Sequence, residues 1–106
     1  MLMFFSPDCD HCQRQTKEML AYKEELKNVQ ILMLSALPYK DAKNFYDDYG
    51  LSSVPNIKVG NDANHNLQGI YKVRTFPSMY LYDQNGSLLK AFAGNIEIPT
   101  ILAALK

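Results

Sequence analysis

The sequence predicts an α/β fold in which helices cover both faces of a mixed sheet of about five strands. Two observations carry this prediction. In the first two thirds of the chain, short apolar runs alternate with segments of helical periodicity, which is typical of parallel crossover units. In the last third, residues 79–82 and 88–92 flank Asp83-Gln84-Asn85-Gly86, a turn that predicts an antiparallel hairpin.

The first half of the chain is expected to form a βαβ unit. Residues 2–5 are apolar and predict a buried strand, which Ser6-Pro7-Asp8 ends. Apolar residues at helical spacing then run from Cys12 to Leu26. Residues 29–37 form a nearly continuous apolar run, so we expect an interior, parallel strand covered on both faces.

The rest of the chain should contain three further helices. Residues 40–49 predict a helix that stops at Gly50, and residues 57–59 follow as a short edge strand. The polar stretch 61–64 is a capping cluster for a short helix through Tyr71. A last helix should open at Pro99, with Ile98, Ile101, Leu102 and Leu105 on its buried side.

Length and composition restrict the class of protein. The chain has 106 residues, which is one domain, and 47% of them are hydrophobic, which is enough for a core. Acidic and basic residues number 11 each, so charge gives no reason to expect nucleic acid or an anionic membrane as a partner. No apolar run approaches the roughly 20 residues of a membrane span. Because the chain starts at its first core strand, we expect a domain, residues 1–106, cut from a longer precursor.

Cys9 and Cys12 are the only cysteines, and they stand where the first strand gives way to a helix. At this offset on a helix two side chains share a face, so the sulfurs can bond and separate with little backbone movement. Cys9 lies at the helix start, where free N–H groups and the helix dipole stabilise a thiolate, the nucleophilic form. Cys12 lies on the apolar stripe. We therefore predict that Cys9 attacks a partner disulfide and that Cys12 resolves the mixed disulfide.

Asp10 and His11 lie between the cysteines and should tune them. An imidazole that stabilises the Cys9 thiolate would make the pair more oxidising, whereas the charge of Asp10 disfavours a neighbouring thiolate. A metal site is the alternative interpretation of this motif. Four consecutive side chains cannot converge on one ion, however, and the only other histidine is His65, so we expect no metal unless two chains share a site.

The chain resembles the thioredoxin superfamily over essentially its whole length. The resemblance rests on the segment Phe4–Cys12, on Val73–Ser78, on the hairpin from Met79 to Phe92 followed by Gly94, and on the final helix. It implies a thioredoxin fold and a protein-disulfide oxidoreductase that needs no cofactor. It also implies that Pro77 is a cis-proline facing the disulfide and that Phe76 offers its backbone to the substrate in a groove.

Residues 38–60 exceed a minimal thioredoxin and form an expected helix–strand insertion, which is similar to the TlpA/ResA-like branch. That branch implies a bacterial periplasmic or envelope location, with the cytoplasm as the other option. The implied partners are protein thiols or disulfides and an upstream dithiol electron carrier, and we expect a monomer. Peroxiredoxins also carry such an insertion, but Ser6-Pro7-Asp8 does not match their cysteine motif.

One departure from the thioredoxin pattern concerns the proton of Cys12. Thioredoxins usually place a buried acid six residues before the first cysteine, and Met3 stands there in this chain. The sequence therefore leaves the proton acceptor unidentified, and Arg14 and Glu18 are expected to be solvated helix residues. This departure keeps a second hypothesis open, a non-catalytic binding module of a larger envelope protein.

Overall fold

The computed structural model describes residues 1–105 and contains the predicted five-stranded mixed sheet. The strands are β1 (Leu2–Phe4), β2 (Ile31–Ser35), β3 (Ile57–Asn61), β4 (Ser78–Tyr82) and β5 (Leu88–Ala93). The helices are α1 (Asp10–Ala21), α2 (Tyr39–Asp48), α3 (Asn66–Tyr71) and α4 (Ile98–Ala104), with short 3-10 turns at Leu51–Ser53 and Ala63–His65. The thioredoxin-type α/β architecture and the helix–strand insertion, here α2 and β3, are confirmed.

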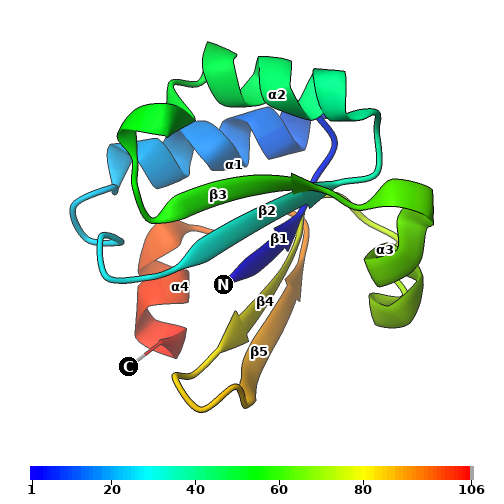
Figure 1. The fold of residues 1–106 in the computed structure, drawn as a ribbon. Helices are drawn as coiled ribbons and strands as arrows, with labels where there is room; N and C mark the ends of the chain where they lie inside the picture. Colours follow the sequence, from blue (N-terminus) through cyan, green and yellow to red (C-terminus); the bar gives the residue numbers. More distant parts are fainter. Residues whose placement is uncertain (106) are drawn as a thin grey trace.

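The sheet order is β3-β2-β1-β4-β5. β2 is parallel to both β1 and β3, as its apolar composition predicted, and β4 pairs antiparallel with β1 and with β5. Figure 1 shows that β1, β2 and β3 point to the same end of the sheet, where α1 begins. Loops that follow the parallel strands therefore gather at one edge.

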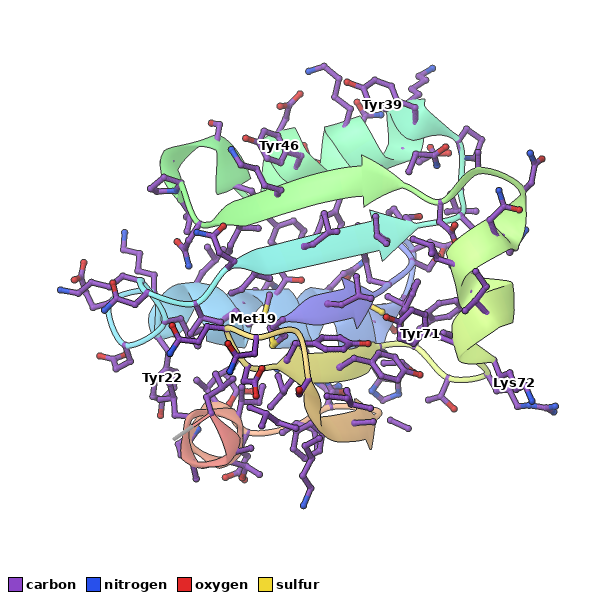
Figure 2. The ribbon with its side chains drawn as sticks, turned by 60° about the horizontal axis from the view of Figure 1, so that its bottom comes forward. Met19, Tyr22, Tyr39, Tyr46, Tyr71 and Lys72 are labelled. Atoms are coloured by element: carbon purple, nitrogen blue, oxygen red, sulfur yellow. The ribbon has the colours of Figure 1, made fainter. Side chains whose placement is uncertain are left out.

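Helices cover both faces of the sheet, but unequally. One core cluster contains Met19 of α1, Phe45 of α2 and Ile101 of α4, so these three helices share a face. On the opposite face Tyr71 of α3 packs against Phe4, with ring centroids 5.4 Å apart. Figure 1 shows α3 apart from the other helices, and Figure 2 shows Tyr71 facing the sheet while Lys72 points outward. Within residues 1–105, no helix is long and apolar enough to cross a membrane.

Because α3 is short, it leaves part of its side of the sheet uncovered. The expectation that β2 is buried on both faces therefore fails at one position. Leu32 in the middle of β2 is 41% exposed, whereas Met33 beside it is fully buried. The apolar run of residues 29–37 predicted burial on both faces, which is wrong for this position. A run of apolar residues identifies an interior strand but does not report how long the covering helix is.

The first helix is also shorter than its periodicity suggested. α1 ends at Ala21, and the following residues form turns up to Asn28. Leu26 is still buried, at 2% exposure. The buried side chain of Asn56 holds the end of these turns, because its Nδ2 donates to the carbonyls of Leu26 at 2.9 Å and Val29 at 2.8 Å. A contact with residue 56 cannot be read from the local pattern.

Two turns behave nearly as predicted. The Asp62 carboxylate accepts hydrogen bonds from the backbone of Leu67 and Gln68, at 2.8 and 2.9 Å, and so caps α3. In the β4–β5 hairpin only Gly86 adopts a positive φ, of 84°, while Asn85 does not. The Asp83 carboxylate instead holds the turn by accepting from the N–H groups of Asn85 and Ser87.

Three methionines lie side by side at the centre of the sheet. Met3 pairs in register with Met33 of β2 and with Met79 of β4, and all three are fully buried. They belong to the same core cluster as Cys12 and Met19. The core around the buried cysteine is therefore apolar. Methionine suits such a core because its side chain is unbranched and its thioether is polarisable.

We expect Met3→Ala to lower the free energy of unfolding by about 2–5 kcal/mol, because it opens a cavity among the central strands. Met3→Leu nearly conserves volume and should cost less than about 1.5 kcal/mol. Urea unfolding measures both, with Leu88→Ala, at a side chain that is 54% exposed, as the surface control. Equal costs for the Leu and Ala variants would contradict this account of the core.

Candidate functional site

Three loops meet at the edge of the sheet where α1 begins. They follow β1, precede β4 and follow β5. The Cys9 thiol lies 3.8 Å from the carbonyl oxygen of Phe76, and the Gly94 N–H donates to the carbonyl of Pro77 at 2.8 Å. Gly94 has a φ of 85°, a conformation that favours glycine, so the chain can turn here toward α4. The loop that carries Cys9 thus contacts the loop that carries Pro77, and the Pro77 loop is hydrogen-bonded to the end of β5.

Cys9 is the N-cap residue of α1. Its backbone is extended, with φ −93° and ψ 119°, and its Sγ accepts a hydrogen bond from the backbone N–H of Cys12 at 3.3 Å. This is the position in which a serine or aspartate oxygen usually caps a helix. Free N–H groups and the positive end of the helix dipole favour negative charge on a sulfur in this place. The half-buried Cys9 thiol is also open to a partner.

Cys12 lies behind Cys9 and is fully buried. Burial raises the pKa of the Cys12 thiol well above its ordinary value, and the hydrogen bond with Cys9 raises it further. The negative charges of Cys9 and Asp8 act in the same direction, while a backbone contact with Ser6 opposes them. Both cysteines are free thiols. The pair is therefore asymmetric: one accessible sulfur sits at a helix start, and one protonated sulfur sits inside the core.

The Phe76–Pro77 peptide bond is cis, as the resemblance implied. Pro77 is buried, Phe76 is half-buried, and the carbonyl oxygen of Phe76 faces the Cys9 sulfur. β4 begins directly afterwards, at Ser78. A backbone carbonyl is thereby held beside the accessible sulfur.

The two residues between the cysteines point outward. Asp10 is exposed and lies in the first turn of α1. His11 is exposed as well, and its hydrogen bonds go to Asn95 rather than to either sulfur. The Nδ1 atom of His11 lies 3.0 Å from Asn95 Oδ1, and its backbone carbonyl accepts from Asn95 Nδ2 at 2.7 Å.

The structure also reveals a polar stripe on α1 that the sequence reasoning missed. His11, Gln15 and Glu18 lie on one side of the helix, and all three contact the segment from Asn95 to Ile98. Glu18 accepts from the backbone N–H of Ile98 at 3.3 Å and so caps α4. The expectation that Glu18 is a solvated residue is therefore wrong, whereas Arg14 is exposed as expected. Polar residues beside the apolar stripe at helical spacing were the available signal.

Met3 confirms that the position of the usual buried acid is apolar, since its side chain is fully buried among methionines. Among residues 1–105, no three histidine, cysteine or acidic side chains gather in a way that could hold a metal ion. His65 lies on the surface with a left-handed backbone.

The fold and the cysteine pair together define a thioredoxin-type domain. The chain belongs to the thioredoxin-like domain family, whose model matches residues 1–106. This confirms the superfamily that the motifs indicated. No curated protein sequence matches the chain.

Solved structures agree in fold. A protein from Chlorobium tepidum, proposed to be the thiol:disulfide interchange protein DsbE, has a TM-score of 0.77 at 24% identity; the match covers 99% of this chain and 78% of that one. A secreted disulfide oxidoreductase of Mycobacterium tuberculosis, homologous to DsbE, has a TM-score of 0.79 at 17% identity and coverages of 97% and 76%. An exposed lipoprotein thioredoxin of Streptococcus pneumoniae has a TM-score of 0.65 at 23% identity and coverages of 98% and 82%. At these identities the likeness establishes the fold.

We expect the reduced protein to lose stability as the pH rises above about 8.5, the ordinary pKa of a cysteine thiol. The raised pKa of Cys12 means that the folded state holds this proton more tightly than the unfolded chain does. The stabilisation is therefore complete below pH 8.5 and falls above it, by up to about 1.4 kcal/mol per pH unit. Urea unfolding between pH 8 and 9.5 measures this fall below the range in which tyrosines titrate.

Cys12→Ser is the matched control for this pH dependence, because it keeps Cys9 and removes only the buried thiol. Its free energy of unfolding should change less over the same interval. Parallel curves for the two proteins would contradict the assignment of the buried proton to Cys12.

Proposed function

We propose that this domain is a protein thiol–disulfide oxidoreductase that works through Cys9 and Cys12. The observation that carries the proposal is the asymmetry of the pair: the Cys9 sulfur caps α1 and is accessible, while Cys12 is fully buried behind it. The family to which the chain belongs supports this chemistry in general terms. The direction of electron transfer depends on the redox potential of the Cys9–Cys12 pair relative to that of its partner.

In the reducing direction the Cys9 thiolate attacks one sulfur of a substrate disulfide. A bond forms between Cys9 and that sulfur, and the second substrate sulfur leaves as a thiolate. While Cys9 is a thiol, it faces the carbonyl of Phe76 at 3.8 Å. Once its proton is lost, that carbonyl is free to accept a hydrogen bond from the substrate backbone.

The Cys12 sulfur then attacks Cys9. The Cys12 thiol loses its proton, a Cys9–Cys12 disulfide forms, and the remaining substrate sulfur leaves as a thiolate, so two electrons have passed to the substrate. The raised pKa of Cys12 delays this step until a base accepts the proton. The leaving substrate thiolate is such a base. This route matches a core in which Met3 replaces the usual acid.

Phe76 and Pro77 are proposed to form the substrate groove, with the Phe76 backbone pairing with an extended substrate segment. Asp10 and His11 are proposed to tune the pair from the exposed side of the first helical turn. The exchange needs no cofactor, because a second dithiol carrier can return or remove the electrons by the same chemistry. A bacterial envelope location is proposed from neighbours in fold that are secreted or exposed on the cell.

With the native reduced protein, iodoacetamide should modify Cys9 at least about tenfold faster than Cys12, because only Cys9 is exposed and placed at a helix start. Peptide mass mapping after short exposure measures both sites. In urea the two rates should become similar. Equal modification of both cysteines in the native protein would contradict the asymmetry.

With dithiothreitol as electron donor, the wild-type domain should reduce a disulfide-containing protein, and Cys9→Ser should abolish the reaction. Cys12→Ser should instead accumulate a mixed disulfide with the substrate, visible on a non-reducing gel, because the resolving thiol is missing. Absence of both turnover and mixed disulfide would favour the alternative, a non-catalytic binding module.

A further inference from the structure

Asn95 lies 84 residues from His11 in the sequence yet makes two hydrogen bonds to it. It sits in the loop between β5 and α4, directly after Gly94, and is half-buried. Its Nδ2 also donates to the side-chain oxygen of Gln15 at 3.3 Å. Asn95 therefore ties the first turn of α1, which carries the cysteines, to the far end of the chain.

The direction of every hydrogen bond in this network is fixed by Gln15, which is fully buried. The Ile96 N–H can only donate, so the atom it meets at 2.8 Å must be the oxygen of Gln15. The Gln15 nitrogen then donates to the carbonyl of Ile96 at 3.0 Å. The Asn95 atom that meets both the Gln15 oxygen and the His11 carbonyl must be a donor, so it is Nδ2.

It follows that the oxygen of Asn95 is the atom that faces His11 Nδ1, at 3.0 Å. An amide oxygen can only accept, so Nδ1 must carry a hydrogen. The partner of one ring nitrogen selects the tautomer of the whole imidazole. In the neutral ring, Nε2 is then the free acceptor.

We propose that Asn95 is a positioning residue that holds His11 in its Nδ1–H form and in one orientation at the first turn of α1, and that it thereby sets the redox equilibrium of the Cys9–Cys12 pair. The second part rests on the proposed function, in which His11 tunes the pair. The first part does not, because a tautomer can be measured without any turnover.

The tautomer test uses protein labelled with nitrogen-15 at histidine, studied by NMR near pH 8, where an ordinary histidine is neutral. His11 should carry its hydrogen on Nδ1. Asn95→Ala should return it toward the Nε2–H form, while Asn95→Asp, which keeps an acceptor oxygen, should preserve Nδ1–H. His65, the only other histidine, is the internal reference and should be unchanged. An Nε2–H ring in the wild type, or no change in Asn95→Ala, would overturn the proposal.

The redox test is equilibration of the reduced and oxidised domain with glutathione. Asn95→Ala should change the equilibrium ratio of dithiol to disulfide by roughly three- to tenfold, and tenfold corresponds to about 30 mV. In a His11→Ala background the same substitution should shift it less than about twofold. Asn85→Ala, in the β4–β5 turn at the opposite end of β4, should have no effect in either background.

The double-mutant comparison separates positioning from a merely structural role. An equal shift in the presence and absence of His11 would mean that Asn95 acts on the pair through the loop and not through the imidazole, which overturns the redox part. A domain that equilibrates with glutathione but turns over no protein substrate would count against the proposed function and leave the role of Asn95 intact.

Discussion

The site depends on one constraint: α1 must start immediately after a buried strand, and the residue at its first position is a cysteine. Cys9 therefore does the work of a capping side chain, with its sulfur held by the N–H of Cys12. The sulfur thereby accepts a hydrogen bond from one of the free N–H groups at the helix start. The same position lies at the positive end of the helix dipole, which favours negative charge. If Cys9 is the nucleophile, as proposed, the capping atom and the reacting atom are the same sulfur, and a substitution of Cys9 changes both the helix start and the reactivity.

The second consequence of this constraint is the burial of Cys12. One turn into the helix, the side chain that shares a face with Cys9 necessarily points at the sheet, where three methionines lie. A thiol in such surroundings keeps its proton. The two sulfurs thus differ in exposure, since Cys9 is half-buried and Cys12 is fully buried, and the proposed division of labour between attack and resolution rests on this difference.

Local patterns were sufficient for the parts of this structure that are local. The strand–cysteine–helix junction, the interior position of β2 and the closing hairpin all lie within short windows whose residue types suit one conformation, whereas the cis bond before Pro77 was implied by the family resemblance. The parts that failed depend on distant partners: Asn56 holds the turns that replace the end of the expected first helix, and Leu32 is exposed because α3 is short. Asn95 was missed for the same reason, since nothing near it in sequence indicates a contact with the motif.

The network around Asn95 lies beside the cysteine motif, whereas the sheet under the motif is apolar. Met3 is buried in that sheet. The polar groups near the motif belong to the stripe of His11, Gln15 and Glu18 on α1 and to the loop that this stripe contacts. On that side Asn95 contacts His11, an exposed residue of the motif. In the proposed function this contact acts on the cysteine pair through His11, whereas the proton of the buried Cys12 passes to the leaving substrate thiolate. The two proposals therefore assign the amide network beside the motif and the methionine core around Cys12 to different steps of the exchange.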